Sequence, residues 1–136
     1  MSHTGSCLCG AVTFEVTGPL RAVIACHCTQ CRKQTGNYMS ATAAKDEYFH
    51  LTETRGLKWY RASDTARRGF CQECGSTLFW KGEGRDYVAI AAGAIDGPLG
   101  VPLEGHIFCA DAGDYYVIAG GDYQLPQWSA NPKAPE

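Results

Sequence analysis

The sequence lacks any long apolar segment, and this absence excludes a helical membrane protein. No run approaches the roughly 20 apolar residues that a membrane-spanning helix needs. The first five residues are polar and no apolar segment follows them, so we do not expect a secretory signal. We therefore predict a cytoplasmic protein, in which cysteine thiols remain reduced.

A surplus of positive charge is also missing. The chain has 12 Lys and Arg residues against 14 Asp and Glu residues, which gives a net charge of -2. Because binding to a phosphate backbone needs a basic field, we do not expect a nucleic-acid partner. Two local basic pairs, at residues 32–33 and 67–68, are interpreted as solvated surface. The alternative is that they anchor an anionic small molecule.

Long helical periodicity is scarce, whereas glycine is frequent. Sixteen of the 136 residues are glycine, well above the usual share of about 7%. Short apolar or alternating runs between turn residues predict a mainly β fold with antiparallel strands. Strands are expected at residues 11–16, 21–26, 37–43, 47–52, 57–61, 87–91 and 105–109, and a tight loop or single helical turn at 29–36. Residues 68–71 lead into a cysteine pair, and residues 77–80 lead out of it.

The length suits one domain with a modest hydrophobic core. We predict a single zinc-binding domain over residues 1–123. Residues 124–136 form a proline-rich, polar tail that we expect to be partly mobile.

The chain contains eight cysteines, and seven of them fall into three short groups. In a reducing compartment such groups favour metal binding over disulfides. Four disulfide bridges would be the alternative if the chain were secreted. Bound iron would colour the protein, whereas zinc would leave it colourless.

Two of the groups are pairs, Cys7 with Cys9 and Cys71 with Cys74, and each pair is followed by a glycine, which lets the backbone turn with positive φ. Two pairs supply four thiolates, which is enough to close a tetrahedral zinc site. Such a site is saturated, so we interpret it as structural and expect metal binding to contribute to folding. A dithiol–disulfide redox pair is the alternative.

The third group consists of Cys26, Cys28 and Cys31. Three thiolates leave one zinc coordination position free, and their negative charge favours a substrate thiolate over water as the fourth ligand. This pattern indicates chemistry on a thiol or its adduct. A redox switch of three cysteines is one alternative, and a closed site is another, with a fourth ligand from Cys109, His106 or His50. His27 is interpreted as a packed or solvent-facing residue rather than a ligand, because strand geometry turns it to the opposite face.

Together the three groups resemble the glutathione-dependent formaldehyde-activating enzyme family. The segments that carry the resemblance are residues 5–12, 26–36 and 68–76, with a weaker similarity at 106–108. The resemblance implies an antiparallel β-tent fold built around a structural zinc ion at Cys7, Cys9, Cys71 and Cys74. It also implies a catalytic zinc ion at Cys26, Cys28 and Cys31, and therefore two zinc ions per chain.

The activity that names this family joins glutathione and formaldehyde into S-hydroxymethylglutathione. We therefore predict a zinc-dependent carbon–sulfur lyase that acts on a small thiol adduct, formed by glutathione and formaldehyde or by a related aldehyde. A non-catalytic, zinc-stabilised protein-binding module is the first alternative, and it would require a fourth protein ligand at the three-cysteine group. A zinc hydrolase of a small C–N or C–S substrate is the second.

Overall fold

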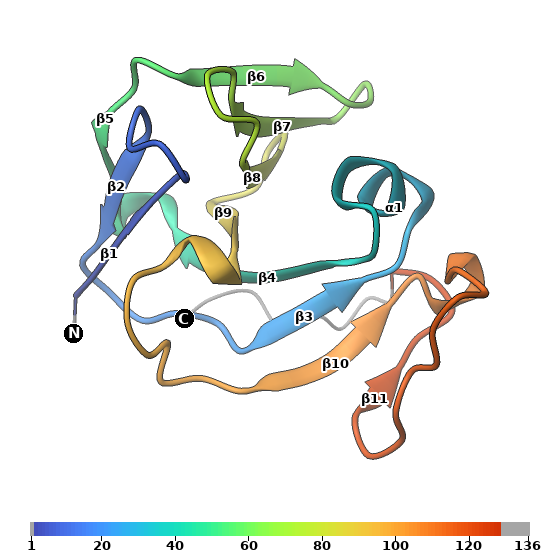
Figure 1. Ribbon diagram of the computed structural model, residues 1–136. Coiled ribbons are helices and arrows are strands. Elements are labelled where there is room, and N and C mark those ends of the chain that lie inside the picture. The colour runs from blue at the N-terminus through green and yellow to red at the C-terminus, as the bar shows by residue number, and fades with distance from the viewer. Residues whose placement is uncertain (1, 129–136) are drawn as a thin grey trace.

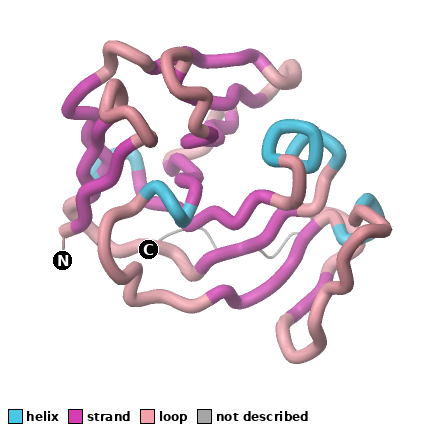
Figure 2. The backbone as a smooth tube through the Cα atoms, viewed as in Figure 1, coloured by secondary structure: helices cyan, strands magenta, loops and turns pink. Residues whose placement is uncertain are grey.

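Strands dominate the computed structural model, which describes residues 2–128 (Figures 1 and 2). The predicted mainly β fold is confirmed. The strands are β1 (His3–Ser6), β2 (Thr13–Val16), β3 (Val23–Cys26), β4 (Met39–Lys45), β5 (Phe49–Glu53), β6 (Leu57–Arg61), β7 (Ala66–Cys71), β8 (Thr77–Gly82), β9 (Tyr87–Ala91), β10 (Leu103–Ile107) and β11 (Tyr123–Gln124). The described residues also form the helix α1 (Thr29–Thr35) and the short 3-10 helices η1 (Asp46–Tyr48), η2 (Ala92–Ala94) and η3 (Cys109–Asp111).

Residues 2–128 are arranged in two sheets. The larger sheet has the strand order β11-β10-β3-β4-β9-β8-β7-β6, and the smaller one has the order β1-β2-β5. All pairs are antiparallel, as predicted, except that β10 runs parallel to both of its neighbours, β3 and β11. Parallel pairing needs a long connection rather than a hairpin. Residues 27–102 connect β3 to β10, and residues 108–122 connect β10 to β11.

The larger sheet bends, so that its two ends face each other. In Figure 1, β6 and β7 lie at the top and β3 and β10 at the bottom, with α1 at one side between these levels. The smaller sheet occupies the opposite side of the molecule. The buried hydrophobic side chains lie in two separate clusters.

The main hydrophobic core is built around aromatic residues from both sheets. Phe14 and Phe79 are fully buried, and their ring centroids lie 5.3 Å apart in an edge-to-face contact. Cys7 and Cys71 belong to this cluster. A second, smaller buried cluster contains Cys31 with Met39, Ala41 and Ala89, and Cys26 and Cys28 pack against it. The cysteine pairs and the three-cysteine group therefore belong to different buried clusters.

Strand pairing continues beyond residue 123, where we placed the end of the domain. Gln124 pairs with His106, and the backbone N–H of Leu125 donates to the His106 carbonyl at 2.9 Å. Residues 129–136, the remainder of the predicted tail, lie outside the described residues. Within the described part of the chain, no helix is both long enough and apolar enough to cross a membrane.

Candidate functional site

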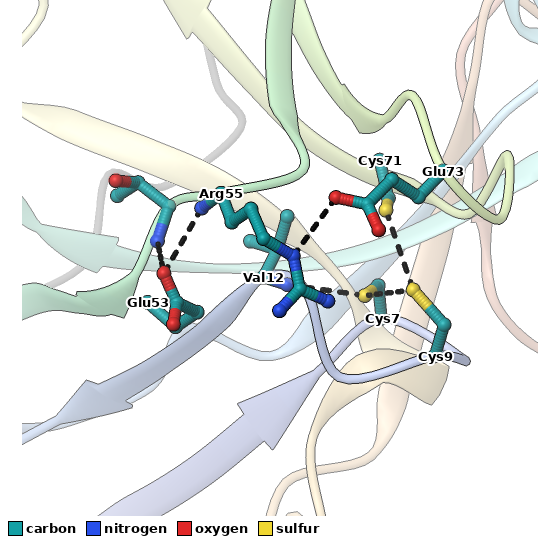
Figure 3. Close-up of polar contacts among 8 residues, drawn as sticks. Cys7, Cys9, Val12, Glu53, Arg55, Cys71 and Glu73 are labelled. Atoms are coloured by element: carbon teal, nitrogen blue, oxygen red, sulfur yellow. Dashed lines mark hydrogen bonds and ion pairs between the residues drawn. The ribbon is translucent and has the colours of Figure 1, made fainter.

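The two cysteine pairs meet at one place, although 62 residues separate Cys9 from Cys71. The sulfur atoms of Cys7, Cys9, Cys71 and Cys74 all lie within 4.8 Å of one another. Figure 3 shows two of these approaches, 3.8 Å between Cys7 and Cys9 and 3.7 Å between Cys9 and Cys71. A tetrahedron whose sulfurs lie about 2.3 Å from its centre has edges of about 3.8 Å. The spacing of this group therefore fits a four-coordinate zinc ion.

Tight turns shape both pairs. Gly10 and Gly75 follow the pairs with φ angles of 83° and 82°, a conformation that glycine adopts without strain. In the first turn the Val12 amide donates to Cys7 Sγ at 3.2 Å (Figure 3). In the second turn the Gly75 amide donates to the Cys71 carbonyl at 2.7 Å. The glycines predicted to allow these turns therefore occupy the positions that require them.

Ser76 connects the two turns. Its hydroxyl oxygen accepts a hydrogen bond from the Leu8 amide at 2.9 Å and lies 3.2 Å from Cys74 Sγ. The hydrogen bond from this hydroxyl, together with the Ser76 backbone amide, lowers the pKa of Cys74 to about 5. Cys74 is thus predisposed to the thiolate form that binds metal.

The three-cysteine group forms where β3 passes into α1. Cys26 ends β3, Cys28 is the N-cap of α1, and Cys31 lies inside the helix. The three sulfurs lie within 4.8 Å of one another, and the Cys31 amide donates to Cys28 Sγ at 3.3 Å. The helical turn that we expected at residues 29–36 brings Cys31 back to Cys26 and Cys28.

None of the three proposed fourth ligands joins this group in residues 2–128. His106 Nδ1 hydrogen-bonds instead with His27 Nε2 at 3.0 Å. His50 lies in β5, in the other sheet, and contacts the Thr17 hydroxyl at 3.3 Å. Cys109 begins η3, and its backbone amide donates to the Leu125 carbonyl. Within the described chain, the group offers a metal three protein ligands.

Arg68 belongs to the candidate site, although the sequence pattern did not identify it as a site residue. We interpreted the pair Arg67–Arg68 as solvated, but the Arg68 side chain is buried against the three-cysteine group. Its two terminal nitrogens lie 3.5 and 3.6 Å from Cys31 Sγ, and one lies 3.9 Å from Cys28 Sγ. Gln30 and Gln34 accept two further hydrogen bonds from the guanidinium. Neighbouring residues in a strand point to opposite faces, and Arg67 therefore remains exposed above Trp59.

The thiols of the three-cysteine group differ in pKa. Hydrogen bonds from Cys26 and then Cys31, with a smaller contribution from the charge of Arg68, lower the pKa of Cys28 to about 2. The hydrogen bond to Cys28, the contact with Cys31 and burial all raise the pKa of Cys26. The cationic guanidinium of Arg68 favours the thiolate form of Cys28.

His27 is fully buried and, as predicted, does not join the three cysteines, although β3 ends at Cys26 and His27 lies just beyond the strand. Its Nδ1 atom hydrogen-bonds with the Tyr116 hydroxyl at 2.6 Å, and its Nε2 atom with His106 at 3.0 Å. Both ring nitrogens are thus engaged by side chains other than cysteine. We infer that His27 fixes the orientation of the turn that carries Cys26 and Cys28.

A cavity of about 490 Å³ opens in front of the three-cysteine group. All three cysteines and Arg68 line it. Apolar side chains that line it include Ile24, Met39, Ala41, Trp80, Ala89 and Ile107. Polar and charged side chains also line it, namely Arg21, Thr29, Gln30, Ser63, Thr65, Arg85 and Asp111. A small organic molecule in this cavity can therefore contact the sulfur atoms while most of its surface is shielded from water.

Replacing Arg68 with methionine is expected to weaken zinc binding at the three-cysteine group by about 10- to 100-fold, the usual effect of losing a group that supports metal ligands. The physical reason is the loss of the positive charge that stabilises the thiolates of Cys28 and Cys31. Zinc affinity would be measured by competition with a chelating dye. Arg67→Met is the matched control, because Arg67 contacts Trp59. Equal affinities for the two variants would contradict the assigned role.

Comparison with known proteins identifies a family and a related fold for this chain. The family described as glutathione-dependent formaldehyde-activating enzyme matches residues 2–111. An uncharacterized lyase of Schizosaccharomyces pombe is 25% identical over 118 residues, which cover 86% of this chain and 85% of that protein. A crystal structure of a Rhodobacter sphaeroides protein has a similar fold, with a TM-score of 0.59 and 24% identity over 74% of this chain and 98% of that chain. Because the family match spans most of the sequence, this chain belongs to the glutathione-dependent formaldehyde-activating enzyme family.

Proposed function

We propose that this protein is a zinc-dependent lyase that makes or breaks a carbon–sulfur bond in a small thiol–aldehyde adduct. The observation that carries the proposal is a group of three cysteine sulfurs that faces an apolar cavity. Such a group leaves a coordination position for a substrate. Membership of the family and the lyase name of the fission-yeast relative support the same reaction class.

The two cysteine groups have different roles in this proposal. Cys7, Cys9, Cys71 and Cys74 hold a structural zinc ion, because four thiolates saturate it and two of them lie in the main core. Cys26, Cys28 and Cys31 hold a second zinc ion at the cavity. When bound there, zinc supplies the Lewis acidity that keeps a substrate thiol in its thiolate form.

The protein's own groups prepare the site for this chemistry. Arg68 places a positive charge against Cys28 and Cys31, which offsets part of the negative charge of the three thiolates. The cavity holds the aldehyde close to the thiol, so that the two reactants meet at high effective concentration. Addition of the thiol S–H across the aldehyde C=O forms one C–S bond and one O–H bond. The reaction therefore needs neither an oxidant nor a reductant.

The proposal is tested by measuring zinc content and reaction rate on the same preparation. We expect about two zinc ions per chain. We also expect the zinc-loaded protein to accelerate exchange between formaldehyde, glutathione and their adduct, as observed by NMR exchange spectroscopy. Zinc X-ray absorption that showed four protein ligands at both ions would overturn the proposal, because neither ion could then accept a substrate. That result would favour a zinc-stabilised protein-binding module.

A further inference from the structure

Arg21 is a buried cation without a carboxylate partner among residues 2–128. Its side chain is 9% exposed, and no Asp or Glu in the described chain lies within 4.0 Å of its nitrogens. Only backbone carbonyls accept its hydrogen bonds, Ala22 from Nε at 3.1 Å and Ala41 from Nη2 at 2.9 Å. A buried charge of this kind is costly unless an anion pairs with it.

Arg21 lines the same cavity as the three cysteines. The strand register gives its place relative to them, because Ala41 is opposite Ile24 and Met39 is opposite Cys26. The guanidinium is held at the Ala41 carbonyl, and Ala41 lies beside Ile24. Ile24 and Cys26 are two residues apart on β3, so the guanidinium lies roughly 7 Å along the strand from Cys26. The apolar side chains of Ile24 and Met39 line the wall between the two polar ends.

A second buried polar group without a partner lies near Arg21. The hydroxyl of Tyr123 is buried and has no hydrogen-bond partner in residues 2–128. Burial raises the pKa of Tyr123, the charge of Glu104 adds to this effect, and the charge of Arg21 opposes it. The charge of Glu104 acts on both Arg21 and Tyr123, but no ion pair within 4.0 Å joins Glu104 to Arg21 in the described chain.

We propose that Arg21 binds an anionic group of the substrate, so that the substrate is a thiol, or thiol adduct, whose carboxylate is joined to the sulfur by a short stem. That the substrate is a thiol rests on the function proposed above. That it carries a carboxylate rests on Arg21. Arg21 is thus a specificity residue that selects anionic thiols over neutral ones.

The test compares two thiols that differ only in charge, 4-mercaptobutyrate and 4-mercaptobutan-1-ol. Calorimetric titration of the zinc-loaded full chain is expected to show about 10- to 100-fold tighter binding of the acid, the range for a hydrogen bond to a charged group. Arg21→Gln should abolish this preference and change the affinity for the alcohol by less than about twofold. Arg67→Gln removes an exposed charge outside the cavity and should leave the preference unchanged.

Arg21 also donates hydrogen bonds to the backbone, so a variant that retains the charge is needed. Arg21→Lys should keep a preference for the acid, and it decides the question if Arg21→Gln fails to fold by circular dichroism. Equal binding of the two thiols by the wild-type protein, or a preference that survives in Arg21→Gln, would overturn the proposal. Loss of the preference in Arg85→Gln but not in Arg21→Gln would place the anion at the exposed edge of the cavity, which also overturns it.

Butyrate, which has no thiol, separates this proposal from the proposed function. Saturation-transfer NMR should detect butyrate on the wild-type protein, and the signal should be lost in Arg21→Gln but retained in Arg21→Lys. If neither thiol binds but butyrate does, the sulfur chemistry fails and the role of Arg21 stands. If both thiols bind equally and butyrate does not bind, the role of Arg21 fails and the sulfur chemistry stands.

Discussion

Replacing Cys71 with serine is expected to prevent the protein from folding to its native state at room temperature. Cys71 is fully buried in the main core, and its sulfur lies 3.7 Å from Cys9 Sγ. Structural zinc ions contribute about 10–16 kcal/mol to the folding of small zinc domains. A typical domain is stable by only about 5–15 kcal/mol, so loss of one ligand removes most of the margin. Far-UV circular dichroism, soluble yield and zinc content would measure the effect.

Cys109→Ser is the matched control for this variant, because Cys109 belongs to neither cysteine group. Its substitution should leave the circular dichroism spectrum and the zinc content unchanged. A Cys71→Ser protein that stayed folded, with a free energy of unfolding close to that of the wild type, would show that the pairs do not hold a structural metal.

Replacing Cys28 with serine should have the opposite pattern, with activity lost and the fold retained. Cys28 packs against the smaller cluster rather than the main core, and it lines the cavity. The variant should lose about one zinc ion per chain. A bound metal contributes several kcal/mol to catalysis, so the rate of adduct formation should fall by roughly 10³-fold or more. Zinc analysis and NMR exchange rates on the same sample would measure both effects.

Thermal unfolding of the Cys28→Ser variant provides the control for its fold. We expect its unfolding temperature to remain within a few degrees of the wild-type value, whereas Cys71→Ser should show no cooperative transition. Equal destabilisation of the two variants would contradict the division into structural and catalytic groups. A Cys28→Ser variant with full activity would exclude the three-cysteine group as the site of the reaction.

Features that depend on local spacing were predictable from the sequence. The pattern of two cysteines followed by glycine predicted the turns at Gly10 and Gly75, because a metal-binding turn needs a residue that tolerates positive φ. The prediction that His27 is a packed residue rather than a ligand is confirmed by its hydrogen bonds to Tyr116 and His106, although β3 ends before it. These inferences need only the geometry of a few consecutive residues.

Features that depend on long-range pairing were not predictable in the same way. The parallel pairing of β10 with β3 joins segments about 80 residues apart, and no local pattern distinguishes it from an antiparallel pair. The sequence around β1 is polar, so it showed no strand signal, although β1 pairs with β2 over four residues. Arg21 and Arg68 resembled ordinary charged residues, because their burial depends on which strand face meets the cavity.

Strand β7 connects the two cysteine groups, since it brings Arg68 to the cavity and ends at Cys71. The two residues are about 10 Å apart along the strand. If Cys7, Cys9, Cys71 and Cys74 hold the structural zinc ion that we propose, a nascent chain without this ion lacks the contact that fixes the end of β7, and with it the position of Arg68. We expect the metal ions to bind in order, with the ion of the two cysteine pairs required before the three-cysteine group can bind its own. Under zinc scarcity, the population should then divide into fully metallated and unfolded chains, with few chains that carry only the cavity ion.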